Sequence, residues 1–382
     1  MARLVLRTAF GGLALVLLTT ACTDAEPRGA RTGSSAGASA ASSAPSAPSG
    51  AAPAAPAAPA ARVTVAQDLE VPWGLAFLPD GSALVTLRDK AEVLQVRPGS
   101  SPVTVGSVEG VTPDGEAGLL GIAVSPEFAS DRRVFVYYTT DSDNRVERFT
   151  LVDGRLQPDK VVVSGIPRAS FHDGGRLAFG PDRRLYIGTG DAGETSRSQD
   201  LGSLGGKILR VDQDGRAPAD NPVAGSPVWS RGHRNVQGLA WDAAGRMYAS
   251  EFGQNTWDEL NLIRKGGNYG WPQVEGKGGD PAYVDPLVQW PTSDASPSGL
   301  AIGRDGAAYV AALAGRSLWR VPLTNGTAGE PERLLEDDLG RIRTVAVGPD
   351  GRLWVITSNT FRGSPGEHDD RVIVMTADAL RS

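Results

Sequence analysis

The stretch AFLPDGSALVT, residues 76–86, joins two short apolar runs through a Pro-Asp-Gly turn. Apolar runs of this length on either side of a tight turn predict a β-hairpin. The same pattern recurs as AVSPEFASDRRVFVYY at 123–138, AFGPDRRLYIGT at 178–189, AWDAAGRMYAS at 240–250, AIGRDGAAYVA at 301–311 and AVGPDGRLWVI at 346–356. The chain therefore repeats one hairpin six times.

The spacing of these hairpins predicts the fold class. Their turns lie about 45 to 62 residues apart, which is the span of a four-stranded propeller blade with its loops. No long stretch shows the period of 3.6 residues that marks an amphipathic helix. We therefore expect an all-β protein, a six-bladed β-propeller, whose functional residues lie in the loops at the mouth of the central channel.

The N-terminal part of the chain predicts export. Arg3 and Arg7 precede an apolar run from Ala9 to Leu18, which is typical of an export signal of the lipoprotein type over residues 1–21. Cys22, the single cysteine, follows it and is the expected site of a lipid anchor on the outer face of the cell membrane; plain secretion is the alternative. A single cysteine excludes an internal disulfide.

The remaining chain divides by composition. Residues 22–61 consist mostly of Ala, Pro and Ser and predict a disordered linker. Residues 62–382 predict the propeller, which is the catalytic domain. The whole chain carries a net charge of −6 and shows no basic patch, so nucleic acid is not an expected partner.

Two of the mouth loops carry a possible acid–base pair. His172 lies in SFHDGGR, and Asp191 follows the next strand-turn-strand unit. If that unit returns to the same end of the blade, the carboxylate can orient the imidazole and raise its basicity, as for a general base. A purely structural His–Asp hydrogen bond explains these residues equally well.

Other loops are rich in arginine. The stretch RGHRNVQG at 231–238 contains Arg234 and Asn235, and GRIR at 340–343 places Arg341 and Arg343 on one face of a strand. Guanidinium and amide groups suit a planar anionic ligand with carboxylate oxygens, although salt-bridged loops between blades would look the same.

Two further loops suggest weaker sites. The oxygen-rich stretch EFGQNTWDE at 251–259 is compatible with a hard cation such as Ca²⁺. Trp290 and Thr292 form an apolar wall with a hydroxyl beside it. Glu275 and Asp280 are candidates for a second, structural calcium site.

Taken in order, these segments resemble a known family. HDGGRLAFGPD, GTGDAG, GKILRVDQDGRAPADNP, GHRNVQGLAW, SEFGQNTWDELNLIRKGGNYGWP and GRIRTVAVGPDG resemble the soluble quinoprotein sugar dehydrogenases. More narrowly, they are similar to the aldose sugar dehydrogenases, six-bladed propellers that use pyrroloquinoline quinone (PQQ) and Ca²⁺. The similarity covers residues 62–378.

The resemblance implies catalytic roles for three residues. His172 would be the general base that takes the proton from the anomeric hydroxyl of a sugar. Asp191 would hold this histidine, and Arg234 would stabilise negative charge beside the reacting quinone carbonyl.

The resemblance also implies a set of binding residues. PQQ contacts would come from Arg234, Asn235, Trp290, Thr292, Arg341 and Arg343. Ca²⁺ would be bound by the backbone carbonyls of Gly253 and Gln254. Glu116 falls where the family has a glutamine or glutamate near the sugar.

The chain departs from the family pattern at two places. Ala314 occupies the position of a cofactor-contacting lysine, and Arg316 is the nearest replacement. The loop after Asp191 is short, which suggests an open mouth, broad use of aldoses and a monomer.

The expected activity is PQQ- and Ca²⁺-dependent oxidation of aldose sugars at C1 to lactones, with electrons passed to a quinone or dye-like acceptor. Two alternatives stay open at this point. One is a non-catalytic ligand-binding propeller, and the other is a calcium-dependent lactonase, which the richness in arginine disfavours.

Overall fold

The computed structural model describes residues 61–380, and the following account concerns these residues. The export signal, Cys22 and all but the last residue of the linker lie outside them. Nearly all regular structure is β-strand; the exceptions are α1 (Phe128–Asp131) and single 3₁₀ turns at Thr195–Ser198 and Asp378–Leu380.

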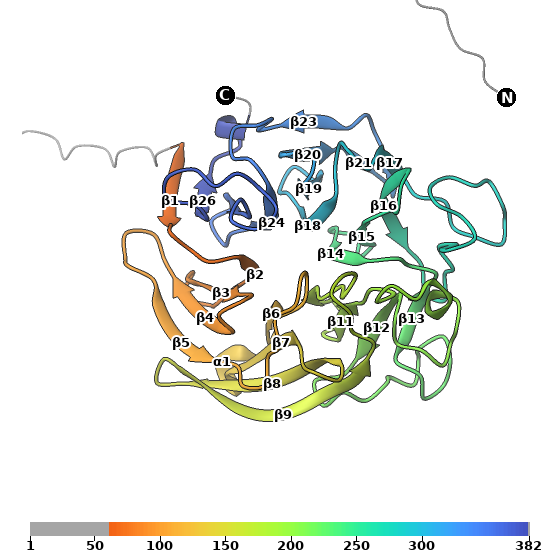
Figure 1. The fold of residues 1–382 in the computed structure, drawn as a ribbon, viewed down its shortest axis with the longest axis horizontal. Helices are drawn as coiled ribbons and strands as arrows, with labels where there is room; N and C mark the ends of the chain where they lie inside the picture. The colour runs from red at the N-terminus through yellow and green to blue at the C-terminus, as the bar shows by residue number, and fades with distance from the viewer. Residues whose placement is uncertain (1–60, 381–382) are drawn as a thin grey trace, which may run out of the picture. The chain divides into compact units, whose positions relative to one another are not determined.

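Six four-stranded antiparallel sheets are arranged as blades around a central axis (Figure 1). This confirms the six-bladed propeller. The strands of the first three blades are β2 (Pro72–Phe77), β3 (Ala83–Leu87), β4 (Glu92–Val96), β5 (Val103–Ser107); β6 (Leu119–Val124), β7 (Arg133–Thr139), β8 (Asn144–Val152), β9 (Arg155–Ile166); and β10 (Leu177–Phe179), β11 (Leu185–Gly188), β12 (Lys207–Val211), β13 (Val228–Arg231).

The other three blades follow the same order. Their strands are β14 (Val236–Trp241), β15 (Met247–Glu251), β16 (Trp257–Ile263), β17 (Val288–Pro291); β18 (Pro297–Ile302), β19 (Ala308–Ala312), β20 (Ser317–Val321), β23 (Glu332–Leu334); and β24 (Ile342–Val347), β25 (Leu353–Thr357), β26 (Val372–Met375), β1 (Arg62–Ala66). A two-stranded hairpin, β21 (Leu323–Thr324) with β22 (Thr327–Ala328), extends the fifth blade.

The repeated phrase of the sequence forms the two innermost strands of every blade. In the first blade, for example, Ala76 lies opposite Leu84 in the β2–β3 pair. The longer second copy, at 123–138, differs because its turn contains α1.

The ring closes between the two ends of the domain. Strand β1 pairs with β26, with Arg62 opposite Met375 and Val63 opposite Val374. The N-terminal strand thus completes the last blade, so both chain ends contribute to the same sheet. The repeat pattern alone did not reveal this closure.

The core consists of apolar clusters between neighbouring blades. Clusters of buried residues pack at each of the six interfaces; between blades one and two, for instance, Val93 contacts the group that contains Val134 and Phe149. Because both faces of each sheet are covered in this way, the strands are apolar on both sides.

Near the axis the blades approach so closely that glycine is required. A Cβ atom placed on Gly121 would lie 2.0 Å from the carbonyl oxygen of Gly175 in the next blade, and one on Gly238 would lie 2.5 Å from the carbonyl oxygen of Ser298. These contacts are with rigid backbone, so a side chain there must push two blades apart.

We therefore expect Gly121→Ala to lower the free energy of unfolding by about 2 kcal/mol or more and the midpoint of thermal unfolding by several degrees. Gly366→Ala is the control, because its Cβ would meet nothing closer than 3.5 Å. Equal melting temperatures for the two variants would contradict the close approach of the blades.

Candidate functional site

The predicted residues gather at one end of the propeller because of how the strands alternate. In an antiparallel blade the start of the first strand and the end of the second strand lie at the same end. The loops that precede the first strand of a blade carry Glu116, His172, Arg234 and Arg341. The loops that follow the second strand of a blade carry Asp191, Phe252 and Leu313. All of these except Asp191 line one cavity of about 190 Å³, together with Ser296, Arg343, Phe361 and Arg362.

His172 and Asp191 meet at the edge of this cavity. Their side chains are joined by a hydrogen bond of 2.8 Å between Nδ1 and Oδ1. The imidazole side chain is 15% exposed and the carboxylate 1%. Among the described residues nothing bonds to the imidazole Nε2, so that atom is available to a ligand.

The backbone around the pair leaves it little freedom. His172 adopts a left-handed conformation (φ 59°), and its carbonyl accepts the amide hydrogen of Ala192 at 3.1 Å. A Cβ atom on Gly190 would lie 1.8 Å from that carbonyl oxygen, so only glycine allows the two loops to meet here.

Asp191 is held in its ionised form. Burial alone would raise the pKa of this carboxyl, but hydrogen bonding to His172 and the charge of the imidazolium outweigh burial and lower the pKa. Trp271 donates its indole N–H to the second oxygen at 2.9 Å, and the Gly193 amide donates to the first. A fixed, ionised carboxylate keeps the proton of the neutral imidazole on Nδ1 and leaves Nε2 as an acceptor.

Arg343 is a buried cation without a carboxylate partner. The residue is 4% exposed, and its Nη1 donates to Gln237 Oε1 at 2.9 Å and to Ser298 Oγ at 3.4 Å. Its Nε has no partner among the described residues. Burial lowers the pKa of this guanidinium, and the neighbouring cations Arg88 and Arg341 lower it further.

Arg341 and Arg234 repeat this situation. Arg341 donates to the Leu313 carbonyl at 3.3 Å, and Arg234 donates to the Phe252 carbonyl at 3.3 Å; each has an Nε without a partner. No described carboxylate forms an ion pair with Arg343 or with either of these two. Arg343 is buried, and Arg234 and Arg341 are half-buried. Because a cation withdrawn from water without a counter-ion is costly, these three around one cavity indicate a site for an anion with several negative groups.

Asn235 supports the same interpretation. Its Oδ1 accepts the Gly174 amide at 3.0 Å, while its buried Nδ2 donates to nothing in the described part of the chain. The amide nitrogen is therefore a further donor for which the protein supplies no acceptor.

Glu116 lies beside the base. One carboxylate oxygen is 3.3 Å from the backbone nitrogen of His172, and the other is 2.7 Å from Nη1 of Arg362. The carboxylate thus bridges the loop of His172 and the exposed Arg362.

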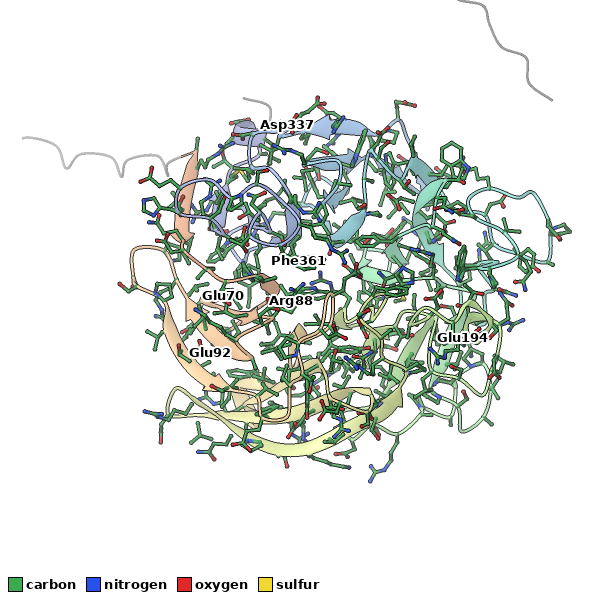
Figure 2. The ribbon with its side chains drawn as sticks, viewed as in Figure 1. Glu70, Arg88, Glu92, Glu194, Asp337 and Phe361 are labelled. Carbon is green, nitrogen blue, oxygen red and sulfur yellow. The ribbon has the colours of Figure 1, made fainter. Side chains whose placement is uncertain are left out.

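Sequence reasoning missed five residues of the cavity wall: Phe252, Ser296, Leu313, Phe361 and Arg362. Phe361 and Arg88 lie near the centre of the propeller in Figure 2. The guanidinium group of Arg88 lies 3.9 Å from the centroid of the Phe361 phenyl ring. A search of the loop that follows the second strand of each blade would have found Phe252, Leu313, Phe361 and Arg362.

Trp290 and Thr292 do not line this cavity, and their role as cofactor contacts stays a prediction. Trp290 lies on β17, the outermost strand of its blade, where it packs against Trp319 with ring centroids 5.7 Å apart. It lines a different cavity near Lys277. In the connection after β17, Ser296, four residues beyond Thr292, lines the cavity.

The loop predicted to bind a cation is fixed by acidic residues. Asp258 accepts the amide hydrogen of Gly253 at 2.8 Å, and Oε1 of Glu275 accepts four successive amide hydrogens, from Gln254 to Trp257. Burial raises the pKa of Asp258 to about 7. No hydrogen bond within the described residues reaches the carbonyl oxygens of Gly253 and Gln254, which leaves both free to coordinate.

The two residues expected at a second calcium site, Glu275 and Asp280, both accept backbone amide hydrogens. One oxygen of Glu275 is occupied by the four amides, and Asp280 accepts the amide of Ala282. Within residues 61–380, no three His, Cys, Asp or Glu side chains come together as a metal site.

The replacement considered for the absent lysine does not reach the cavity. Arg316 forms an ion pair of 2.5 Å with Asp337, which lies at the outer edge of the ring in Figure 2. The cation that lines the cavity instead is Arg362.

The other two histidines lie outside the cavity wall. His233 is fully buried, bonded to Ser230 and Glu251 and stacked on Tyr269. It fixes the loop that carries Arg234. His368 is exposed and pairs with Asp68.

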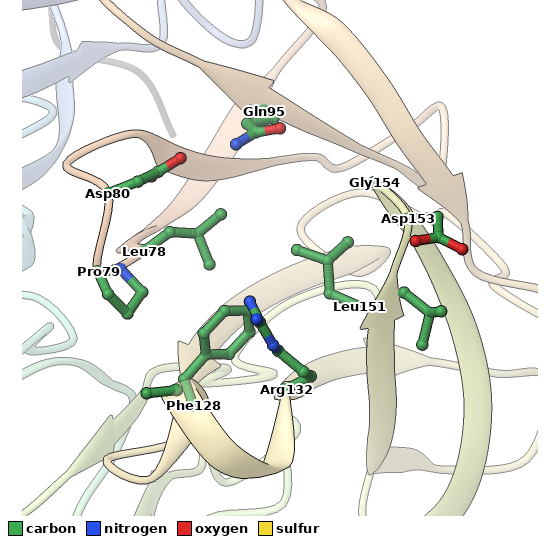
Figure 3. A pocket seen from close by; sticks show the side chains of 11 residues that line it. Leu78, Pro79, Asp80, Gln95, Phe128, Arg132, Leu151, Asp153 and Gly154 are labelled. Carbon is green, nitrogen blue, oxygen red and sulfur yellow. The ribbon is translucent and has the colours of Figure 1, made fainter.

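A cavity of about 660 Å³ lies away from these residues (Figure 3). It is formed by the β2–β3 turn, α1 and the β8–β9 turn, at the opposite end of the blades from the mouth. None of the predicted site residues lines it.

Asp173, next to His172, makes stability depend on pH. Burial raises the pKa of Asp173 to about 7; one oxygen accepts hydrogen bonds from Asn144 and the Ala169 amide, and the other has no described partner. Because the folded state binds this proton more tightly than the unfolded state, the free energy of unfolding should fall as pH rises from about 4 to about 7.

Asp173→Asn keeps an acceptor oxygen and removes the charge. We expect it to raise the free energy of unfolding by roughly 2 to 4 kcal/mol at pH 8 and to flatten its decline between pH 4 and 7. Urea unfolding across this pH range measures both effects, with Asp153→Asn in an exposed turn as the control. If Asp173→Asn were less stable than the wild type at pH 8, other groups of the folded protein would have to stabilise the ionised Asp173 carboxylate.

Residues 69–363 match the model of the family described as glucose/sorbosone dehydrogenase. The chain is 33% identical to aldose sugar dehydrogenase YliI of Escherichia coli over 340 residues, which cover 78% of this chain and 90% of the relative. It is 34% identical to quinoprotein glucose dehydrogenase B of Acinetobacter calcoaceticus over 58% of this chain and 54% of the relative.

Solved structures agree with these relatives. The PQQ-bound aldose sugar dehydrogenase of Streptomyces coelicolor superimposes with a TM-score of 0.79 at 51% identity, over 82% of this chain and 96% of that structure. The apo form of the soluble Escherichia coli aldose sugar dehydrogenase gives a TM-score of 0.73 at 28% identity, over 82% and 98%.

Proposed function

This chain belongs to the glucose/sorbosone dehydrogenase family, and from that membership we propose that it oxidises aldose sugars with PQQ and Ca²⁺ as cofactors. The sugar would lose two electrons at C1 and leave as a lactone, and the electrons would pass to a quinone or dye-like acceptor. One observation carries the proposal: a histidine–aspartate pair stands at the edge of a cavity where Arg234, Arg341 and Arg343 have no carboxylate partner among the described residues.

The donor set fits PQQ. This cofactor is planar and carries three carboxylates, and Arg234, Arg341 and Arg343 present guanidinium groups that lack counter-ions. The free Nδ2 of Asn235 supplies a further donor. When bound, PQQ supplies the two-electron acceptor for the hydride that leaves C1 of the sugar.

The chain itself moves the proton. His172 Nε2 would accept the proton of the C1 hydroxyl, and Asp191 would stabilise the imidazolium that forms through the 2.8 Å hydrogen bond to Nδ1. Arg234, which donates to the Phe252 carbonyl at the cavity wall, would place positive charge beside the developing negative charge. Glu116, bonded to the backbone of His172, would accept a hydrogen bond from a neighbouring sugar hydroxyl.

The cation site is proposed on the loop after β15. The free carbonyl oxygens of Gly253 and Gln254 are hard donors that suit Ca²⁺, and the carboxylates of Asp258 and Glu275 hold the loop in shape by accepting its amide hydrogens. A Ca²⁺ ion there would polarise the bound cofactor.

Dye reduction by the purified chain tests the function. The protein is supplied with a panel of aldoses, with and without PQQ and Ca²⁺, and we expect reduction only when both are present. No reduction with any aldose, together with no PQQ-induced change in absorbance or melting temperature, would favour the non-catalytic binding propeller.

We also propose export and membrane attachment. Residues 1–21 would direct export, residues 22–61 would be the linker, and the lipid would be attached to Cys22; the catalytic domain would be a monomer. The part of the chain that the structure describes contains no helix long and apolar enough to cross a membrane. Incorporation of labelled palmitate into the wild type but not into Cys22→Ser tests the anchor.

A further inference from the structure

Phe171, the residue before the base, has an exposure that the proposed catalytic steps do not explain. The exposed large apolar side chains among residues 61–380 are Val103, Val152, Val161, Phe171, Leu201 and Val223. Phe171 is the single aromatic among them, 42% exposed, and it lies at the mouth. An aromatic ring left in water forfeits a large burial energy, which makes its position beside a reactive group an indication of a ligand contact.

The ring is held in one orientation. It meets the imidazole of His172 edge-on, with ring centroids 4.7 Å apart and an interplanar angle of 90°. On another side it lies against Gly193, where a Cβ atom would be 2.9 Å from Cζ of the ring. The Phe171 ring therefore packs between the His172 imidazole and the Gly193 backbone, and these contacts restrict its rotation while part of it stays exposed.

One oxygen of Asp191 holds both His172 and Gly193, the residue on which the Phe171 ring lies. Oδ1 of Asp191 is bonded to Nδ1 of His172 at 2.8 Å and accepts the amide hydrogen of Gly193 at 2.9 Å. The distance between the reactive Nε2 and the Phe171 ring is therefore set by a single rigid unit.

A carboxylate completes the arrangement. The Glu116 amide donates to the Ser170 carbonyl at 2.9 Å, and its side chain reaches the His172 nitrogen, so Glu116 flanks the segment that carries the ring. An apolar ring, a carboxylate acceptor and a base match the parts of a pyranose, which has a face of C–H groups and a rim of hydroxyls.

We propose that Phe171 is a specificity-determining residue, the platform for the C–H face of a cyclic sugar whose C1 hydroxyl points to His172. The inference rests on the proposed function and names its substrate class: aldopyranoses with equatorial hydroxyls. An axial hydroxyl on the stacked face would separate the sugar from the ring and lose its own hydration without a hydrogen bond in return.

Saturation-transfer NMR on the full chain without PQQ tests this contact separately from turnover. For β-glucose we expect transfer from the protein to be concentrated on the protons of one pyranose face. Phe171→Ala should abolish that selectivity, Phe171→Tyr should keep it, and Val103→Ala on the distant strand β5 should not change it. Equal transfer to both faces in the wild type, or an unchanged pattern in Phe171→Ala, would overturn the proposal.

Kinetics on the loaded enzyme give the second readout. Phe171→Ala should raise KM for glucose about ten-fold while kcat stays within three-fold and the affinity for PQQ is unchanged, and Phe171→Tyr should restore KM. The preference for glucose over a sugar with an axial hydroxyl on the stacked face should fall by a similar factor. An unchanged KM contradicts the platform, whereas a wild type that oxidises no aldose contradicts the proposed function and leaves the NMR result to decide the platform.

Discussion

Replacement of His172 by glutamine is expected to lower kcat by about 10³-fold and to leave the affinity for PQQ within a factor of three of the wild type. Glutamine cannot take a proton at neutral pH, and a positioned general base typically contributes 10² to 10⁴ in rate. The groups proposed to bind the cofactor lie on other loops, so the substitution should lower kcat and not the affinity for PQQ. Dye reduction at saturating sugar gives the rate, and a titration of PQQ absorbance gives the affinity.

The chain offers a matched control for this substitution. His368 is also in the left-handed region (φ 64°, against 59° for His172), and it also pairs with an aspartate through Nδ1, at 3.0 Å. It is 51% exposed and lies outside the cavity. His368→Gln thus makes the same chemical and backbone change away from the site and should retain full activity. Near-normal turnover by His172→Gln would show that the base is another group.

Replacement of Arg343 by methionine is expected to weaken PQQ binding by about 10- to 100-fold without lowering the stability of the protein free of cofactor. The charge-assisted hydrogen bonds of a buried guanidinium to a carboxylate contribute about 1.5–3 kcal/mol. In the cofactor-free protein the same guanidinium is a buried charge without a carboxylate partner, so its removal relieves a cost. Gln237 Oε1 retains a hydrogen bond from Ser298 at 2.8 Å, so no acceptor is left unpaired.

Arg210 is the matched control because it is equally buried, at 5% exposure, but fully paired. It bonds to Asp182 at 2.9 Å, to Asp220 at 2.8 Å and to Asn221 at 2.9 Å. Arg210→Met should lower the melting temperature and leave PQQ binding unchanged, the opposite of Arg343→Met. If Arg343→Met bound PQQ like the wild type, the cavity would not be the cofactor site.

The repeated hairpin made the fold predictable from sequence. A strand-turn-strand unit is encoded locally by apolar alternation and by turn residues such as Pro79 and Gly81, so six copies could be recognised without knowledge of their packing. The closure of the ring by β1 was not predictable in this way. Its partner β26 lies about 310 residues further on, and the sequence of a single strand does not determine which strand it pairs with.

Within the site, the sequence alone determined the residue types of the loops and their order: a histidine with an aspartate after the next hairpin, three arginines, and an oxygen-rich loop. These groups were predictable because each lies next to a strand whose direction was already known, as for His172 and Asp191 on either side of one hairpin. The tertiary structure decided which loop residues reach the axis. It placed Ser296 at the cavity and Trp290 on the outermost strand of its blade, because the distance from an outermost strand to the centre depends on how two blades pack against each other. It also set the exposed ring of Phe171 on Gly193, a contact between two loops that only the packed fold brings together.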